Sequence, residues 1–227
     1  MAENTFKPYI QIPNLSLALA IVATAMLAQL LFSTLFGNII GTTWVNNSIG
    51  ALLMTNLLQI CTLYLFAQYL RNFSVKRLVT VFYIIIACIG LMTLAPLMSY
   101  ALLGIFQASS IISFTSRLAN LSIIILFFMA GFRLMRFDKD FVGGMNLLGK
   151  AFILEGITAS ITFIYYYYQL FTAIPMSTRD RLLKAPDLVT LVVSTMTLIS
   201  TILIFICMIN IYKRAIKYNN TVDRDEN

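Results

Sequence analysis

Six long apolar stretches occupy most of this 227-residue chain and restrict what it can fold into. An α-helix rises about 1.5 Å per residue, so about 20 apolar residues cross the ~30 Å hydrocarbon core of a bilayer. We therefore predict an all-α, polytopic transmembrane helical bundle of six spans, which forms a single membrane domain over residues 1–227. The predicted spans cover residues 15–36, 48–70, 78–103, 116–135, 147–172 and 188–212.

The composition argues against a water-soluble core. Charged residues make up 11% of the chain, whereas ordinary soluble domains carry about 25%, and the mean hydropathy is +0.86. The net charge of +7 comes from Lys and Arg that flank the apolar stretches, which is the pattern of membrane anchoring. We therefore expect the lipid bilayer as a partner, together with membrane proteins or further copies of the chain, and no nucleic acid.

The first apolar stretch has one alternative interpretation. Residues 15–22 followed by Ala23, Thr24 and Ala25 have the form of a signal-peptide core with its cleavage site. Apolar residues continue through Phe36, however, and Lys7 alone supplies positive charge before the stretch. We therefore expect an uncleaved first span.

The distribution of Lys and Arg predicts that both termini lie in the cytoplasm. Arg117, Arg179, Arg181 and Lys184 fall on one side of the predicted bundle, and the rest of the 16 basic residues fall on the other. Basic residues resist translocation, so the richer side is cytoplasmic. This gives an N-in, C-in protein of a bacterial inner (plasma) membrane, with residues 213–227 as a charged cytoplasmic tail.

The depth of Arg117 in the membrane depends on where the fourth span begins. With a start beside it, Arg117 anchors the helix at the outer head groups, which is what we expect. With a start near Gln107, the same side chain lies within the membrane and approaches an acid.

Small residues predict a close helix contact along the first span. Ser16, Ala20, Thr24 and Ala28 follow one another at intervals of four residues. Small side chains let membrane helices approach closely, so this face is a candidate packing surface. Its partner is either another helix of the chain or a second subunit.

Two polar faces run along the last two spans. Glu155, Thr158, Thr162, Tyr165 and Gln169 share one face of the fifth span. The sixth span carries its own row at the same kind of spacing: Thr190, Ser194, Thr197 and Thr201. Two interpretations remain open, because such hydroxyls either pack against their own helix and a neighbour or line a cavity.

Glu155 is the acidic residue that lies well inside a predicted span. A charge at mid-membrane costs at least ~2.5 kcal/mol, so this carboxyl is protonated, paired or in contact with water. Gln59 and Asn56 lie near the same depth in the second span and are candidate hydrogen-bond partners. Either Glu155 binds a proton or a cation, or it reaches the interface beside Lys150. The candidate polar site comprises Glu155, Gln59, Asn56, Thr158, Thr162, Thr197 and Thr201.

The sequence lacks the usual catalytic residues. It contains no His, which removes His-based metal sites, His-ligated haem and His-activated nucleophiles, and it has no phosphate-binding Gly-rich loop. We expect no enzymatic activity, no metal and no cofactor. We expect a non-catalytic subunit or accessory protein of a membrane assembly. The alternative is a small permease that uses a polar face of the fifth and sixth spans, with Glu155 as its proton- or cation-coupling carboxyl.

Overall fold

The structure of the chain, a computed structural model, describes residues 13–39, 49–71, 75–101, 106–136, 144–172 and 188–225. Within these ranges the chain is almost entirely α-helical and contains no strand, and six helices are long and apolar enough to cross a membrane. This confirms the predicted all-α chain with six candidate spans. The helices are α1 (Pro13–Ile39), α3 (Ile49–Arg71), α4 (Lys76–Ala101), α5 (Phe106–Met135), α6 (Met145–Thr172) and α8 (Leu188–Asp225).

Two helices extend well beyond their predicted bounds, whereas the bounds of the other four differ by up to three residues. Helix α5 begins at Phe106 rather than at residue 116, because Gln and Ser near its start lower the hydropathy without breaking the helix. Helix α8 continues through the predicted tail to Asp225, although its apolar segment ends at Ile216. Lys, Arg and Ala favour a helix in water as well as in lipid, so hydropathy marks the end of the apolar segment rather than the end of the helix.

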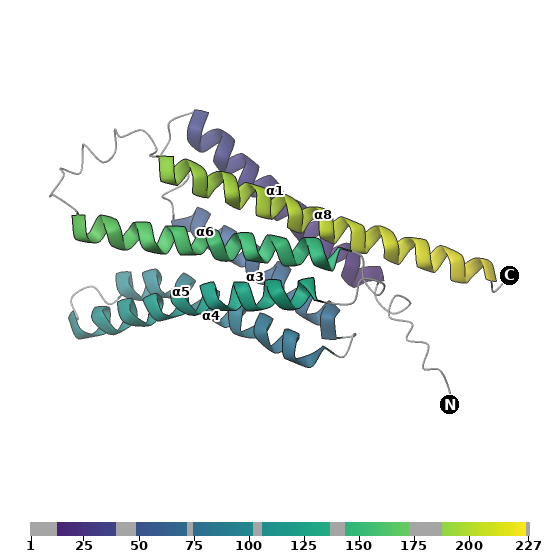
Figure 1. Cartoon of the computed structure of the whole chain (residues 1–227), viewed down its shortest axis with the longest axis horizontal. Coiled ribbons are helices and arrows are strands. Elements are labelled where there is room, and N and C mark those ends of the chain that lie inside the picture. Colours follow the sequence, from purple (N-terminus) through teal and green to yellow (C-terminus); the bar gives the residue numbers. More distant parts are fainter. Residues whose placement is uncertain are drawn as a thin grey trace.

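The six helices form a closed ring. Each helix packs mainly against its neighbours in the chain, and α1 closes the ring by packing against α8. All six run roughly along the long axis of the molecule, alternating in direction (Figure 1). Short connections between antiparallel neighbours explain the order, and the contact between the first and last helices encloses an interior.

One end of the ring carries most of the described positive charge, and we call it the basic end. Here α1, α4 and α6 begin and α3, α5 and α8 reach their apolar limits (Figure 1). Nη1 of Arg133 donates to the carbonyl oxygen of Arg77 at 3.4 Å, which links α5 to α4. The exposed basic side chains at this end are Arg71, Lys76, Arg77, Arg133, Arg136, Lys150, Lys213 and Arg214.

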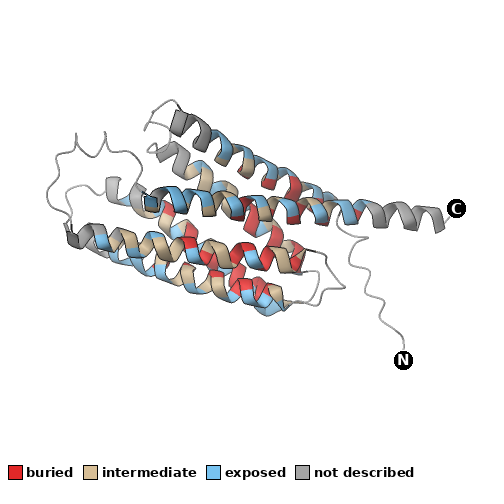
Figure 2. Ribbon diagram, turned by 45° about the horizontal axis from the view of Figure 1, so that its top comes forward, coloured by how far each residue is buried: buried red, intermediate tan, exposed pale blue. Residues whose placement is uncertain are grey.

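The half of the ring near the basic end is densely packed. Phe82 of α4 lies edge-on to Phe66 of α3 and to Phe152 of α6, with ring centroids 5.2 and 5.3 Å apart. Phe127 of α5 lies 5.7 Å from Phe152, so four helices meet in one aromatic cluster. Figure 2 shows the buried residues gathered in this half. Further fully buried side chains here are Leu70, Leu78, Leu134, Met145, Leu148, Met208 and Ile211.

Gly144 connects the start of α6 to α8 through hydrogen bonds. Gly144 has a φ of 105°, a conformation that side-chain-bearing residues rarely adopt. Its carbonyl oxygen accepts from the N–H of Leu148 at 2.9 Å and from the thiol of Cys207 at 3.4 Å. The turn therefore joins the first turn of α6 to α8 at the basic end.

The predicted small-residue face of α1 is only partly inside the ring. Ser16 and Ala20 are buried, whereas Thr24 and Ala28 are exposed. Each step of four residues turns about 40° further around a helix with 3.6 residues per turn, so the row drifts from the inner to the outer surface. The face of α1 that is buried along its length passes instead through Leu19, Ala23 and Met26.

The closest helix contact joins α5 to α6 through two glycines. A Cβ atom at Gly131 would lie 2.8 Å from the carbonyl oxygen of Gly149, and one at Gly149 would lie 2.7 Å from that of Gly131. Both backbones occupy the space that a side chain needs. Farther from the basic end, in the same pair of helices, Gly156 of α6 packs against the ring of Phe128 in α5.

We predict that Gly149→Ala destabilises the protein by roughly 1–3 kcal/mol, because the added methyl group must push α5 away from α6. Gly90→Ala is the matched control, since a Cβ at Gly90 meets no atom within 4 Å. Denaturant titration of helicity in mixed micelles measures both. Equal stability of the two variants would contradict the contact.

Candidate functional site

Two cavities lie inside the ring. The large cavity has a volume of about 600 Å³ and is bordered by α3, α4, α5, α6 and α8. The small cavity, of about 140 Å³, is bordered by α1, α3, α5, α6 and α8. The side chains that line both are Gln59, Phe127, Glu155 and Thr197. These four residues mark the level at which the two cavities meet. From here the small cavity extends toward the basic end, where Phe66, Leu148 and Phe152 line it.

Glu155 lies at this junction. It is ten residues along α6 from Met145, which places it about 15 Å into the helix and near the middle of a ~30 Å hydrocarbon core. Its side chain is half-buried, and it lines both cavities. The interface position beside Lys150, which the sequence left open, is not the one observed, because Glu155 faces the interior of the ring.

Ser200 of α8 is the hydrogen-bond partner of this carboxyl. Its hydroxyl donates to Oε1 of Glu155 and also lies 2.9 Å from the carbonyl oxygen of Thr197. Ser200 is fully buried. The sequence analysis named neither Ser200 nor this contact, because the face that α8 presents to α6 is fixed only when the two helices pack.

The two amide side chains predicted as partners of Glu155 form no hydrogen bond with it in the described residues. Nδ2 of Asn56 donates to Oγ1 of Thr93 in α4 at 2.9 Å, so this amide joins α3 to α4. Gln59 lines both cavities with Glu155, but within the described ranges no hydrogen bond joins the two side chains. In the same region, Nε2 of Gln29 in α1 donates to Oγ1 of Thr55 in α3 at 2.7 Å.

The threonine hydroxyls of the two polar faces combine both interpretations that the sequence left open. Thr158 and Thr162 donate to carbonyl oxygens four residues earlier in α6, at 2.8 and 2.9 Å. Thr197 and Thr201 do the same in α8, at 3.0 and 2.8 Å. All four also line a cavity. Their protons are satisfied within the helix, while the oxygen atoms remain acceptors for a solute. The side chains of Gln169 and Thr190 lie outside the described residues.

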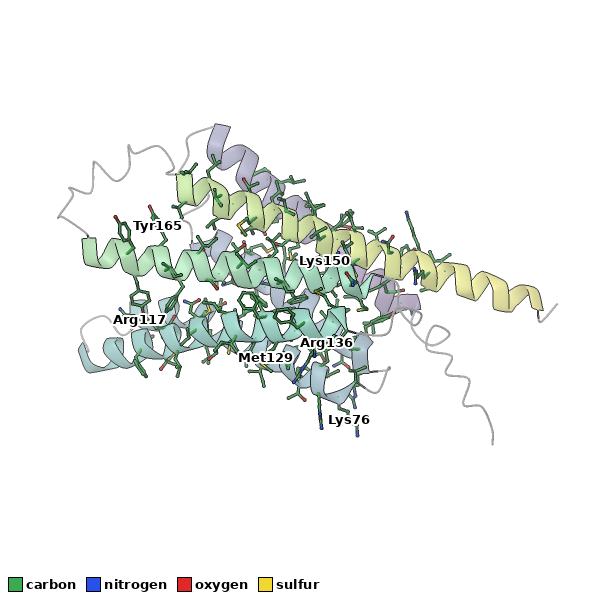
Figure 3. The ribbon with its side chains drawn as sticks, in the orientation of Figure 1. Lys76, Arg117, Met129, Arg136, Lys150 and Tyr165 are labelled. Atoms are coloured by element: carbon green, nitrogen blue, oxygen red, sulfur yellow. The ribbon has the colours of Figure 1, made fainter. Side chains whose placement is uncertain are left out.

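Arg117 lies within α5, three residues after Phe114, where the apolar segment of the helix begins. Eleven residues precede it in the helix, and its side chain lines the large cavity with Tyr167 of α6. The guanidinium carbon lies 5.9 Å from the centroid of the Tyr167 ring, which is cation–π distance. Figure 3 places Arg117 between α5 and α6, at the end away from Lys76, Arg136 and Lys150.

The described residues offer no metal site. No group of three Cys, Asp or Glu side chains gathers in the part of the chain that the structure describes. Cys88 and Cys207 are buried, Cys61 is exposed, and all three are free. The polar side chains that line the two cavities are therefore one carboxyl, one guanidinium, amides and hydroxyls.

Comparison with protein-family models, with curated proteins and with solved structures found no match to this chain.

We predict that the large cavity is accessible to water and that the dense half is not. In a chain whose three native cysteines are replaced by alanine, Asn120→Cys should react with a membrane-impermeant methanethiosulfonate. Asn120 lines the large cavity, whereas Leu134 is fully buried near the basic end and lines neither cavity. Leu134→Cys should therefore stay unlabelled under the same conditions, and equal labelling of the two would contradict the asymmetry.

Proposed function

We propose that this protein is a small membrane carrier in which Glu155 couples solute movement to a proton or a cation. The observation that supports it is the position of Glu155 where the two cavities meet, half-buried and hydrogen-bonded to Ser200. No basic side chain forms an ion pair with Glu155 within the described ranges. A carboxyl that is unpaired in the membrane is expected to serve function rather than stability.

The contact with Ser200 gives Glu155 two hydrogen-bonding states. A hydroxyl has one proton to donate. When Glu155 is ionised, Ser200 donates to the carboxylate. When Glu155 is protonated, its own O–H donates to Oγ of Ser200, which is then free to donate to the carbonyl oxygen of Thr197, 2.9 Å away. Proton binding therefore reorganises one link between α6 and α8 without leaving a buried group unsatisfied.

The packing asymmetry corresponds to one conformation of a transport cycle. The large cavity lies in the hollow half of the ring, away from the basic end. In the other half, the aromatic cluster of Phe66, Phe82, Phe127 and Phe152 lies beside the small cavity, which three of its rings line. We propose that transport requires this cluster to separate, so that the cavities become accessible from the basic end. The two protonation states of Glu155 would favour different arrangements of α6 and α8.

We propose that the basic end faces the cytoplasm, with both termini on that side, in a bacterial inner membrane. The exposed Lys and Arg side chains at that end support this orientation, since basic residues are retained on the cytoplasmic side. The large cavity then faces outward in the conformation described.

A second function, that of a non-catalytic accessory subunit, is favoured by one observation. Thr24 and Ala28 continue the small-residue row of α1 onto the exposed surface of the ring. Small residues there would let a helix of another protein approach closely. Purification in mild detergent tests this function: a stoichiometric partner supports it, and a monodisperse monomer contradicts it.

Flux measurements in proteoliposomes test the carrier function. Vesicles that contain a pH-sensitive dye are exposed in turn to organic ammonium ions, carboxylates and phosphates. We expect the parent protein to move protons with one of these classes of solute. The proton flux of Glu155→Gln should fall to the rate of protein-free vesicles, because an amide side chain does not bind and release a proton near neutral pH.

Thr195→Val is the matched control for this experiment. Thr195 is exposed on α8 and bonds to its own helix at Leu191, so its replacement should leave the flux unchanged. A parent protein that moves protons with none of the solutes, or a Glu155→Gln variant with parental flux, would contradict the carrier function.

A further inference from the structure

One end of the large cavity carries a cationic side chain that lies away from Glu155. Arg117 and Tyr167 line it on α5 and α6. Tyr167 is twelve residues beyond Glu155 in α6, which is about 18 Å along the helix. Arg117 and Glu155 are therefore too far apart to pair. Of the side chains that line the two cavities, these two are the charged ones.

Arg117 keeps its hydrogen-bonding capacity for a ligand. Its contact with Tyr167 is made through the face of the aromatic ring, and stacking of this kind orients a guanidinium without using its N–H donors. Its side chain is exposed, and no carboxylate forms an ion pair with it in the described part of the chain. A guanidinium whose N–H donors are free is matched by a carboxylate or a phosphate, which accept in a bidentate manner.

Neutral polar groups and an apolar wall surround this cation. Ser116 and Asn120 lie on the same helix and line the same cavity, where they can donate to further oxygen atoms of an anion. The surface between this cationic end and Glu155 carries apolar side chains beside the hydroxyls of Thr158 and Thr162. The apolar side chains include Met92, Ile123 and Phe163.

From this arrangement we infer that Arg117, with Tyr167, Ser116 and Asn120, binds the anionic group of an organic carboxylate or phosphate, whose apolar body lies along the cavity wall. The inference rests on the proposed carrier function for the role of this anion as substrate. Binding itself does not depend on that function. An anion held by Arg117 lies far from Glu155, so the two sites can be occupied together.

Equilibrium binding of radiolabelled octyl phosphate to the full-length protein in phosphatidylcholine nanodiscs tests the inference. We expect the parent protein to bind it and Arg117→Gln to lower the affinity roughly tenfold or more, as the loss of a charge-assisted contact does. Arg117→Lys should retain part of the affinity, since it keeps the charge but loses the planar fork. Asn120→Asp keeps Arg117 and should also weaken binding, because a carboxylate one turn away competes for the guanidinium.

Arg136→Gln is the matched control, since it removes an exposed Arg at the basic end, outside the cavity. It should bind octyl phosphate as the parent does. Three results would overturn the inference. These are failure of the parent to bind octyl phosphate, equal affinity in the parent and Arg117→Gln, and a parent that binds octyltrimethylammonium as tightly as octyl phosphate.

The source of the anion is resolved by competition. Displacement of octyl phosphate by phosphatidylglycerol added to the nanodiscs supports an anion drawn from the lipid phase, and displacement by soluble alkyl carboxylates alone supports a water-borne one. Binding that depends on Arg117 in a protein without proton flux would contradict the carrier function and keep this site. Flux that depends on Glu155 but not on Arg117 would support the carrier function and contradict a role of the Arg117 site in transport.

Discussion

A carboxyl group in the middle of a membrane constrains everything that surrounds it. Lipid provides no hydrogen bonds, so Glu155 has to be placed on the inside of a closed structure that supplies polar partners and space for water. The ring of six helices does this by packing α1 against α8, which separates the interior from lipid. Ser200 then supplies the partner for the carboxyl from the neighbouring helix.

The asymmetric packing of the ring follows from the side chains that face inward. Near the basic end, Phe and Leu side chains fill the interior, and Gly131 and Gly149 bring α5 and α6 into backbone contact. In the other half, the inward side chains on α6 and α8 include hydroxyls that bond to their own helix, such as Thr158 and Thr197. Such residues fill less space between helices, and the larger cavity remains there.

Hydropathy predicted the six helices well because lipid imposes a direct requirement on length and composition. It also singled out Glu155, since an acid within an apolar stretch is visible in a single sequence. The part of α5 before residue 116 was missed for the same reason, because its polar residues lower the hydropathy. The apolar segment of α5 begins at Phe114, close to the predicted start of the span beside Arg117.

Contacts between helices could not be predicted from the sequence alone. Which face of α8 meets α6 depends on the relative rotation of two helices, so Ser200 was not identified as the partner of Glu155. The row from Ser16 to Ala28 was treated as straight, although steps of four residues drift around the helix. Gly131 and Gly149 could have been noted as small residues in spans, but their pairing needs the three-dimensional arrangement.

Infrared difference spectroscopy of the protein in lipid, recorded between two pH values, tests the central claim most directly. A carboxyl that lies at a water-accessible cavity inside the ring should show a protonated C=O band that changes with pH, and the Glu155→Gln variant should lack that band. If parent and variant give the same difference spectrum, Glu155 exchanges no proton with water. The account of a coupling carboxyl at the junction of two cavities would then be wrong.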